Sequence, residues 1–112
     1  MQRDCKGYQL TKTMPHQPPK KITIGGIVLT VRVDPSLDSW GEYHSDKREI
    51  LLASRTLDKA STLRETLRHE MTHAALDICG LSHLVRYEEE TIVRALENVF
   101  FPAWDKVRKQ LK

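Results

Sequence analysis

The stretch Arg68 to Leu76, with the sequence RHEMTHAAL, constrains this chain more than any other. His69 and His73 are four residues apart, so on an α-helix they stand one turn apart on the same face. That spacing lets both imidazoles reach one metal ion. Glu70 lies one step around the helix from His69, close enough to hydrogen-bond a water on that ion without being a ligand. The stretch therefore predicts a helix that carries a metal site with a carboxylate beside it.

The pattern His-Glu-x-x-His is the arrangement of zinc peptidases, in which two histidines bind the metal and the glutamate is the general base. It predicts that Glu70 takes a proton from a zinc-bound water, and that this water then hydrolyses a peptide bond. The alternative interpretation is a pair of surface histidines on a solvated helix face, with no metal.

An amphipathic pattern supports a helix around this motif. Apolar residues recur at steps of three and four, as in a helix that faces a core: Leu63, Leu67, Met71, Ala74 and Ile78. The two histidines flank this stripe, so we expect them to be half-buried. A capping box formed by Thr62 and Glu65 predicts the start, with Asp58 as an earlier alternative N-cap. Gly80 predicts the end, as the residue just past the last turn.

Length and composition are those of one ordinary globular domain. The 112 residues, 39% hydrophobic and 29% charged, allow a single modest core. No run approaches the ~18 consecutive apolar residues of a membrane span, and Met1 to Tyr8 lacks the apolar segment of a secretory signal. Cys5 and Cys79 are too few for a disulfide framework, so we expect reduced thiols and a cytoplasmic protein. A net charge of +3, with both signs mixed, does not predict nucleic-acid binding.

The chain ahead of the motif predicts an irregular arm followed by strands. Residues 1–20 contain Pro15, Pro18 and Pro19 and few large apolar residues, so we expect an arm ahead of a domain over residues 21–112. Cys5 and His16 are of metal-ligand type. The arm therefore either reaches the metal and inhibits it, or is an untethered polar tail.

β-branched residues dominate the next stretch. Residues 22–33 alternate around Gly25-Gly26, which predicts two strands joined by a Gly-Gly turn, or one bent strand. Further strands are expected within residues 37–45 and over 49–53, with a turn at 46–48. We expect residues 49–53 to be an edge strand that aligns an extended peptide by strand addition.

Two histidines do not complete a catalytic zinc site, which usually has three protein ligands and one open position. The candidates lie downstream of the motif. His83 sits in a short connection after the metal helix. Glu88, Glu89 and Glu90 open a second helix, where carboxylates also suit the positive N-terminal end.

The second helix is expected from Tyr87 to near the C-terminus. Its apolar stripe consists of Ile92, Val93, Leu96, Val99 and Phe100. Pro102 follows and is expected to kink or divide the helix, because proline has no N–H and its ring clashes with the preceding turn.

The metal-binding residues and part of the second helix carry a family resemblance. His-Glu-Met-Thr-His at 69–73, followed by Glu90-x-x-Val93-x-x-Leu96, resembles the small gluzincin-type zinc metallopeptidase domains. These include the ImmA/IrrE-like and SprT-like proteins of bacteria and bacteriophages. Residues 40–42 and 48–52 are similar to the strands that the short phage-type domains place before their metal helix.

The resemblance covers roughly residues 22–100 and implies an α+β, minimal zincin-like fold. In such a fold a small twisted sheet packs on the metal helix, and the second helix closes the site. The resemblance also implies that His69, His73 and Glu90 bind Zn²⁺, with Glu89 as the alternative to Glu90. A third histidine followed by glycine, as in SprT-like members, is not matched, because Leu84 follows His83.

The expected function is therefore that of a zinc metallopeptidase acting on a peptide or protein, without a membrane or nucleic-acid partner. Tyr43, His44 and Tyr87 are the candidates to stabilise the oxyanion, and the sequence does not choose among them. One alternative is a metal-stabilised, catalytically inactive protein-binding module. Glu70 separates the two, because a structural site does not require a carboxylate there and prefers a closed fourth position. A weaker alternative is a nucleic-acid-binding accessory domain using Lys106, Arg108, Lys109 and Lys112.

Overall fold

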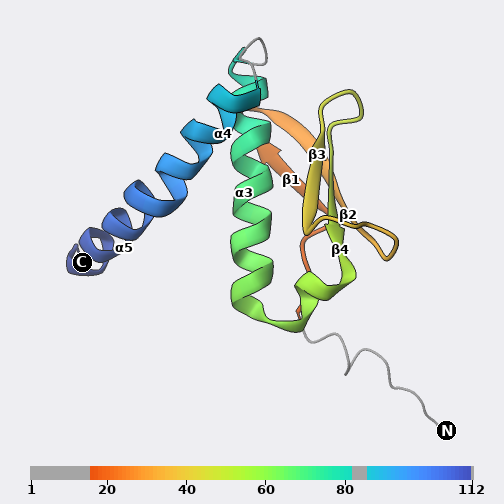
Figure 1. Ribbon diagram of the computed structural model, residues 1–112, viewed down its shortest axis with the longest axis horizontal. Coiled ribbons are helices and arrows are strands. Elements are labelled where there is room, and N and C mark those ends of the chain that lie inside the picture. The colour runs from red at the N-terminus through yellow and green to blue at the C-terminus, as the bar shows by residue number, and fades with distance from the viewer. Residues whose placement is uncertain (1–15, 82–85, 112) are drawn as a thin grey trace, which may run out of the picture.

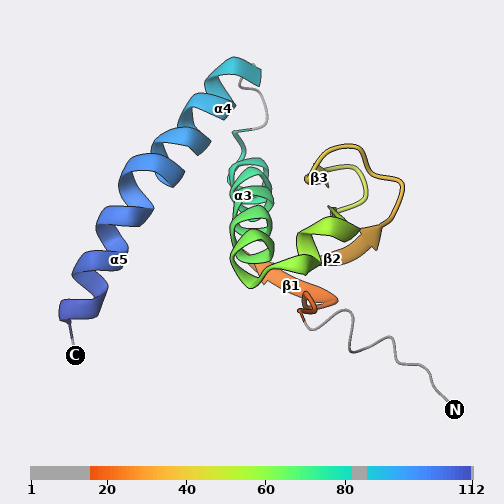
Figure 2. The ribbon, with the colours of Figure 1, turned by 60° about the horizontal axis from the view of Figure 1, so that its bottom comes forward.

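The computed structural model describes residues 16–81 and 86–111 (Figure 1). In this part of the chain, four strands form one mixed sheet, and helices lie on one side of it. Helix α3 lies between the sheet and the last helical segment of the chain (Figure 2). The fold class is α+β, as the sequence predicts.

The first two strands form a hairpin. β1 (Lys21–Ile24) pairs antiparallel with β2 (Ile27–Asp34), and the two residues between them, Gly25 and Gly26, have φ of +57° and +81°. A type I′ turn needs positive φ at both central positions, which glycine adopts at little cost. The prediction of two strands with a Gly-Gly turn is confirmed, and the bent single strand is wrong.

The next two strands complete the sheet in the order β1-β2-β4-β3. β4 (Glu49–Ala53) runs parallel to β2 and antiparallel to β3 (Gly41–His44). β4 is therefore a central strand, and the prediction that it is an edge strand is wrong. Its last four residues are all buried, and a continuous apolar run of this kind is typical of a strand covered on both faces. Among the described strands, the edges are β1 and β3.

A 3₁₀ turn, η1 (Ser54–Asp58), leads directly into helix α3 (Ala60–Ile78). The N-cap is Lys59, which makes no side-chain capping bond; its carbonyl accepts the Leu63 N–H at 3.0 Å. The predicted capping box at Thr62 is wrong, and the alternative N-cap Asp58 is one residue too early. The helix therefore begins after one extended residue, without a side-chain cap.

The end of α3 is as predicted. Gly80 has a φ of +85°, and its N–H donates to the Asp77 carbonyl at 3.0 Å. The Leu81 N–H donates to the Leu76 carbonyl at 2.9 Å. These two bonds form a Schellman motif, in which a glycine in the left-handed region stops the helix.

The core lies between the sheet and α3. Val31, Ile50 and Leu52 form its buried centre. The side chains packed against this centre are Ile22, Tyr43, Leu63, Leu67 and Met71. The predicted apolar stripe of α3 therefore faces the sheet, and it leaves the neighbouring helix face, which carries the histidines, at the margin of the core.

The last helical segment has three parts: α4 (Arg86–Ala95), the π-helical turn η2 (Leu96–Phe100) and α5 (Phe101–Gln110). The Phe101 N–H donates to the Leu96 carbonyl, five residues back, as a π turn requires. This wider turn ends two residues before Pro102, so the regular α-helix is interrupted where the sequence predicts that proline kinks or divides it.

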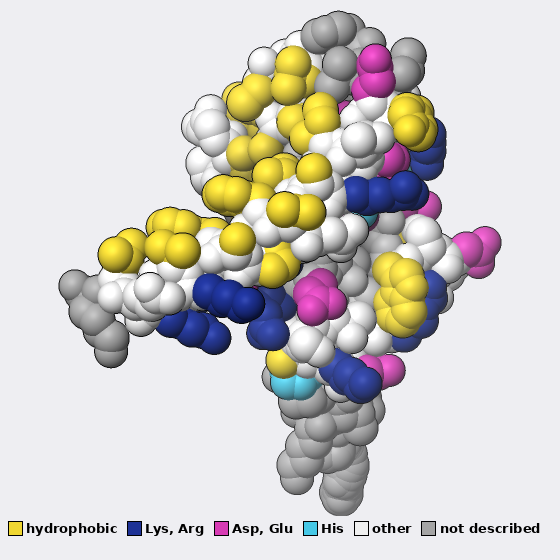
Figure 3. All heavy atoms as spheres, turned by 60° about the vertical axis from the view of Figure 1, so that its left-hand side comes forward, with side chains coloured by type: hydrophobic (Ala, Val, Ile, Leu, Met, Phe, Trp, Pro, Cys, Tyr) yellow, Lys and Arg dark blue, Asp and Glu magenta, His cyan; other side chains and the backbone are white. Residues whose placement is uncertain are grey.

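The two ends of this segment differ in their surroundings. α4 lies beside α3, whereas α5 extends away from it (Figure 1). Apolar side chains follow one side of α5, and Lys and Arg side chains follow another (Figure 3). No helix in residues 16–81 or 86–111 is long and apolar enough to cross a bilayer.

The predicted N-terminal arm falls mostly outside the described residues, as does Cys5. Residues 16–20 contain neither helix nor strand, and the first strand begins at Lys21.

Candidate metal centre

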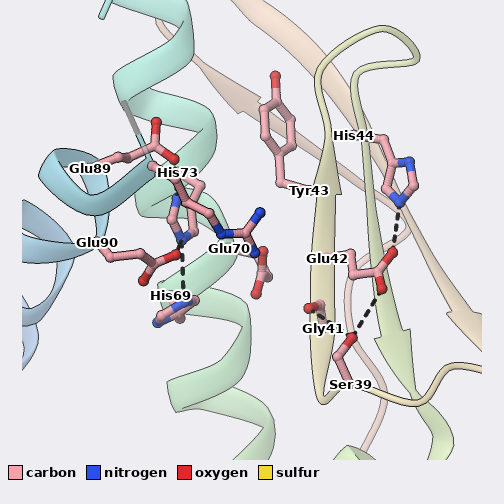
Figure 4. A pocket seen from close by; sticks show the side chains of 11 residues that line it. Ser39, Gly41, Glu42, Tyr43, His44, His69, Glu70, His73, Glu89 and Glu90 are labelled. Carbon is pink, nitrogen blue, oxygen red and sulfur yellow. Dashed lines mark hydrogen bonds and ion pairs between the residues drawn. The ribbon is translucent and has the colours of Figure 1, made fainter. Parts of the chain in front are cut away.

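Three side chains converge between α3 and α4 (Figure 4). His69 and His73 come from successive turns of α3, and Glu90 comes from α4. Each offers one ligand atom, and these atoms all lie within 4.8 Å of one another. His73 Nε2 is 3.3 Å from His69 Nε2 and 3.3 Å from Glu90 Oε2. The structure thus brings together the three residues that the sequence and the resemblance select.

A carboxylate binds Nδ1 of each imidazole, the ring nitrogen on the side away from the centre. His69 Nδ1 lies 2.6 Å from Glu97 Oε2, and His73 Nδ1 lies 2.7 Å from Glu89 Oε1. An ionised carboxylate only accepts hydrogen bonds, so in each pair the proton belongs on Nδ1. In a neutral imidazole, a proton on Nδ1 leaves a lone pair on Nε2, and the two Nε2 atoms face the centre. Metal-binding histidines commonly have such a carboxylate partner, which orients the ring and raises its basicity.

With neutral imidazoles, the three converging atoms are acceptors that could hold a cation. If both rings are neutral with the proton on Nδ1, the two Nε2 atoms are both acceptors and cannot hydrogen-bond each other, although they are 3.3 Å apart. The Glu90 carboxylate adds a third acceptor and a negative charge. Three converging acceptors repel one another unless a positive charge lies between them. Two imidazole nitrogens and one carboxylate oxygen form a donor set that suits Zn²⁺ and leaves a fourth position open.

The two adjacent glutamates of α4 have different roles. Glu90 faces the Nε2 side of His73, whereas Glu89 binds Nδ1 of the same ring. This geometry favours Glu90 over Glu89 as the third ligand.

His83, the other candidate for the third ligand, lies outside the described residues. His16 belongs to no cluster of three potential ligands in the described part of the chain.

Sequence reasoning missed Glu97. It follows Glu90 by seven residues, two helical turns, so both lie on the α3-facing side of the segment with the buried Val93 between them. That spacing was the available signal, since metal-binding histidines commonly have an orienting partner. Glu97 lies in η2, and π turns occur frequently at functional sites.

Glu70 is buried beside the ligands, with only 6% of its surface exposed. Burial raises the pKa of its carboxyl, and the charges of Glu90 and Glu42 act in the same direction, while His69 and His73 oppose the shift.

A close approach of β3 to α3 produces this burial. A Cβ added at Gly41 would lie 3.0 Å from Thr66 Cγ2 and 3.2 Å from Glu70 Cγ, which is tighter than side chains normally pack. Glycine at position 41 therefore lets the edge strand cover Glu70.

Two cavities meet at this carboxylate. The larger, of about 530 Å³, lies between β3 on one side and α3 with the start of α4 on the other. The smaller, of about 330 Å³, extends from the same point toward Trp40 and Glu65. Gly41, His69 and Glu70 line both cavities. The candidate metal centre and Glu70 are therefore open to a molecule that occupies either one.

The three side chains considered for oxyanion stabilisation lie in different places. The Tyr43 hydroxyl donates to Asp77 Oδ2 at 2.8 Å, and burial together with this bond raises the pKa of Tyr43 to about 12. Tyr87 is 78% exposed and lines neither cavity. His44 lines the larger cavity, where its Nε2 lies 2.9 Å from Glu42 Oε1. The Tyr43 and Tyr87 hydroxyls are therefore not directed at the three ligand atoms.

Comparisons with known proteins add nothing to this geometry. No family model, no curated protein and no solved structure matches the chain. The resemblance to small gluzincin-type domains therefore rests on the motif residues, and the assignment of a function rests on the site itself.

Proposed function

We propose that this protein is a zinc-dependent metallopeptidase that hydrolyses peptide bonds. One observation carries the proposal: three acceptor atoms of His69, His73 and Glu90 converge, while both Nδ1 atoms are bound by carboxylates. A buried carboxylate that is not one of these acceptors, Glu70, lies beside them. A structural site has no need of such a group.

Within this function, each residue of the centre has a distinct task. Zn²⁺, when bound, supplies Lewis-acid activation of water and of the scissile carbonyl. His69, His73 and Glu90 hold the ion. Glu70 accepts a proton from the attacking water and returns it to the leaving amine. Its position between the two cavities gives it access to both.

The substrate is proposed to lie along β3. β3 is an edge strand in the described sheet, and all four of its residues line the larger cavity. An extended peptide can add to such an edge through main-chain hydrogen bonds. This replaces the expectation for residues 49–53, whose strand β4 is paired on both sides.

A reducing, cytoplasmic location belongs to the same proposal. Cys79 is a free and exposed cysteine among the described residues, and unpaired thiols persist in a reducing compartment.

The decisive experiment is Glu70→Gln. The variant is expected to keep one zinc per chain but to cleave a diverse peptide library about 10²–10⁴-fold more slowly, the usual cost of removing a general base. Glu88→Gln on α4 is the matched control and is expected to cleave at the wild-type rate. The assay includes a chain that begins at Lys20, in case residues 1–19 cover the cleft. If neither wild-type form cleaves any peptide while both bind zinc, the protein is a metal-stabilised binding module.

A further inference from the structure

The smaller cavity has lining residues that take no part in the proposed hydrolysis. Four of its lining residues, Trp40, Glu65, Thr66 and Glu97, do not line the larger cavity. It begins at His69 and Glu70 and runs along α3 toward the start of that helix. A substrate that crosses the metal centre would therefore place a side chain adjacent to the scissile bond in this cavity.

The charge of the cavity is negative. Three carboxylates line it, those of Glu65, Glu70 and Glu97, and no Lys or Arg is among the described residues that do so. Glu97 is already bound to His69 Nδ1. Glu65 is exposed and stands one helical turn before His69, so the two side chains lie on the same face of α3.

Trp40 forms an aromatic wall of the same cavity and is 52% exposed. Its ring is held in place by Arg55, whose guanidinium lies 4.5 Å from the ring centroid. Arg55 in turn donates to the Asp38 carbonyl at 2.7 Å, which ties it to the loop before β3. The aromatic wall is thus positioned before any ligand binds.

An aromatic wall beside a carboxylate suits one class of side chain. Lys and Arg carry a long apolar stem and a cationic end, and the stem packs on apolar surface while the charge reaches a polar partner. We propose that the cavity is a specificity subsite for a Lys or Arg of the substrate, with Trp40 contacting the stem and Glu65 binding the charge. That the bound peptide is a substrate rests on the proposed peptidase function; the binding preference does not.

The fluorescence of Trp40 can report whether a peptide occupies the smaller cavity. The chain has two tryptophans, and Trp104→Phe leaves Trp40 as the only one. In a zinc-loaded Trp104→Phe, Glu70→Gln protein, tryptophan-free peptides that differ at one position are titrated while Trp40 fluorescence is recorded. Peptides with Lys or Arg are expected to bind about tenfold more tightly than the peptide with norleucine, which keeps the stem but lacks the charge.

Substitutions at Glu65 then test the assignment. Glu65→Gln is expected to remove most of the preference, and Glu65→Lys to shift it toward a peptide with Glu at that position. Glu88→Gln, outside both cavities, is expected to leave the preference intact. Equal binding of the Lys and norleucine peptides, or a preference that survives Glu65→Lys, overturns the proposal.

The outcomes separate this inference from the proposed function. If wild-type protein cleaves peptides with no basic preference, the peptidase function stands and the subsite is wrong. If no peptide is cleaved but Lys peptides still bind preferentially with a Trp40 signal, the subsite stands and the peptidase function is wrong.

Discussion

The two halves of the last helical segment have similar amphipathic patterns and different surroundings. In α4 and η2, Val93 is fully buried, and Glu90 and Glu97 are directed at the histidines of α3. In α5, none of the ten residues, all of them described, is buried; Trp104 and Val107 are 44% and 45% exposed. The apolar period therefore predicts a helix in both halves, but only proximity to α3 turns one of them into part of the site.

The π turn η2 lies where the two halves meet. A π turn contains more residues than an α turn, so it rotates the residues after it relative to those before it. Glu97 lies within this turn and reaches His69, and Phe101 follows it and lies against Arg68 of α3, whose guanidinium carbon is 4.5 Å from the ring centroid. Beyond Phe101, the described part of α5 leaves α3. The comparison predicts that substitutions of the α4 and η2 residues that contact α3 affect metal binding or stability, and that substitutions in α5 beyond Phe101 affect neither.

The largest effect is expected from the histidines that α4 and η2 surround. His69→Ala combined with His73→Ala removes two of the three ligand atoms, so stoichiometric zinc binding should be lost. Elemental analysis after dialysis measures this, with one zinc per chain expected for the wild type and for a His16→Ala control. A double variant that retains full zinc would place the metal elsewhere in the chain.

The third ligand is expected to have the next largest effect. Glu90→Gln should weaken zinc affinity by more than about 100-fold, since losing a ligand should exceed the loss of an orienting partner. Competition with a chelator measures the affinity, and Glu88→Gln on the same helix is the control with wild-type affinity. Equal affinities for wild type and Glu90→Gln would move the assignment to Glu89 or His83.

The orienting carboxylates should matter less than the ligands. Glu97→Gln and Glu89→Gln are each expected to lower zinc affinity about 10–100-fold, because a neutral amide still accepts the Nδ1–H bond but no longer raises the basicity of the ring. Asp105→Asn in α5 is the matched control, and the same chelator titration should show no change. If Glu97→Gln binds zinc like the wild type, the contact between η2 and α3 has no role in the site.

The smallest effect concerns packing alone. Val93→Ala should lower the free energy of unfolding by about 1–3 kcal/mol, because a fully buried side chain loses two methyl groups and leaves a cavity. Val107→Ala, at an exposed position of α5, should change it by less than about 0.5 kcal/mol. Denaturant unfolding of the zinc-free variants measures both values. Similar losses at the two positions would show that α5 is packed against a surface in solution.

Much of the site was readable from the sequence because it depends on local geometry. A four-residue spacing on a helix places His69 and His73 on one face wherever that helix lies in the fold. The positive φ at Gly25, Gly26 and Gly80 also follows from local backbone sterics, so the hairpin turn and the end of α3 were predictable. These features survive in the structure unchanged.

Other features depend on contacts between distant segments, and here local patterns were insufficient. The central position of β4 depends on its pairing with β2 and β3, although its continuous apolar run was a signal. The start of α3 follows the 3₁₀ turn η1 and the extended residue Lys59, and the Thr62 capping pattern does not mark it.

The choice between the adjacent carboxylates Glu89 and Glu90 separates most clearly what local sequence determines from what tertiary packing decides. The sequence by itself determined that a glutamate near the start of the second helix was available to the two histidines. Successive helical residues point about 100° apart, so only the rotation of α4 against α3 decided that Glu90 faces the Nε2 atoms while Glu89 holds Nδ1 of His73. The same rotation, carried through η2, brought Glu97 to His69. A helix specifies its own faces from local sequence, but which face meets a neighbour is settled only when the two helices pack.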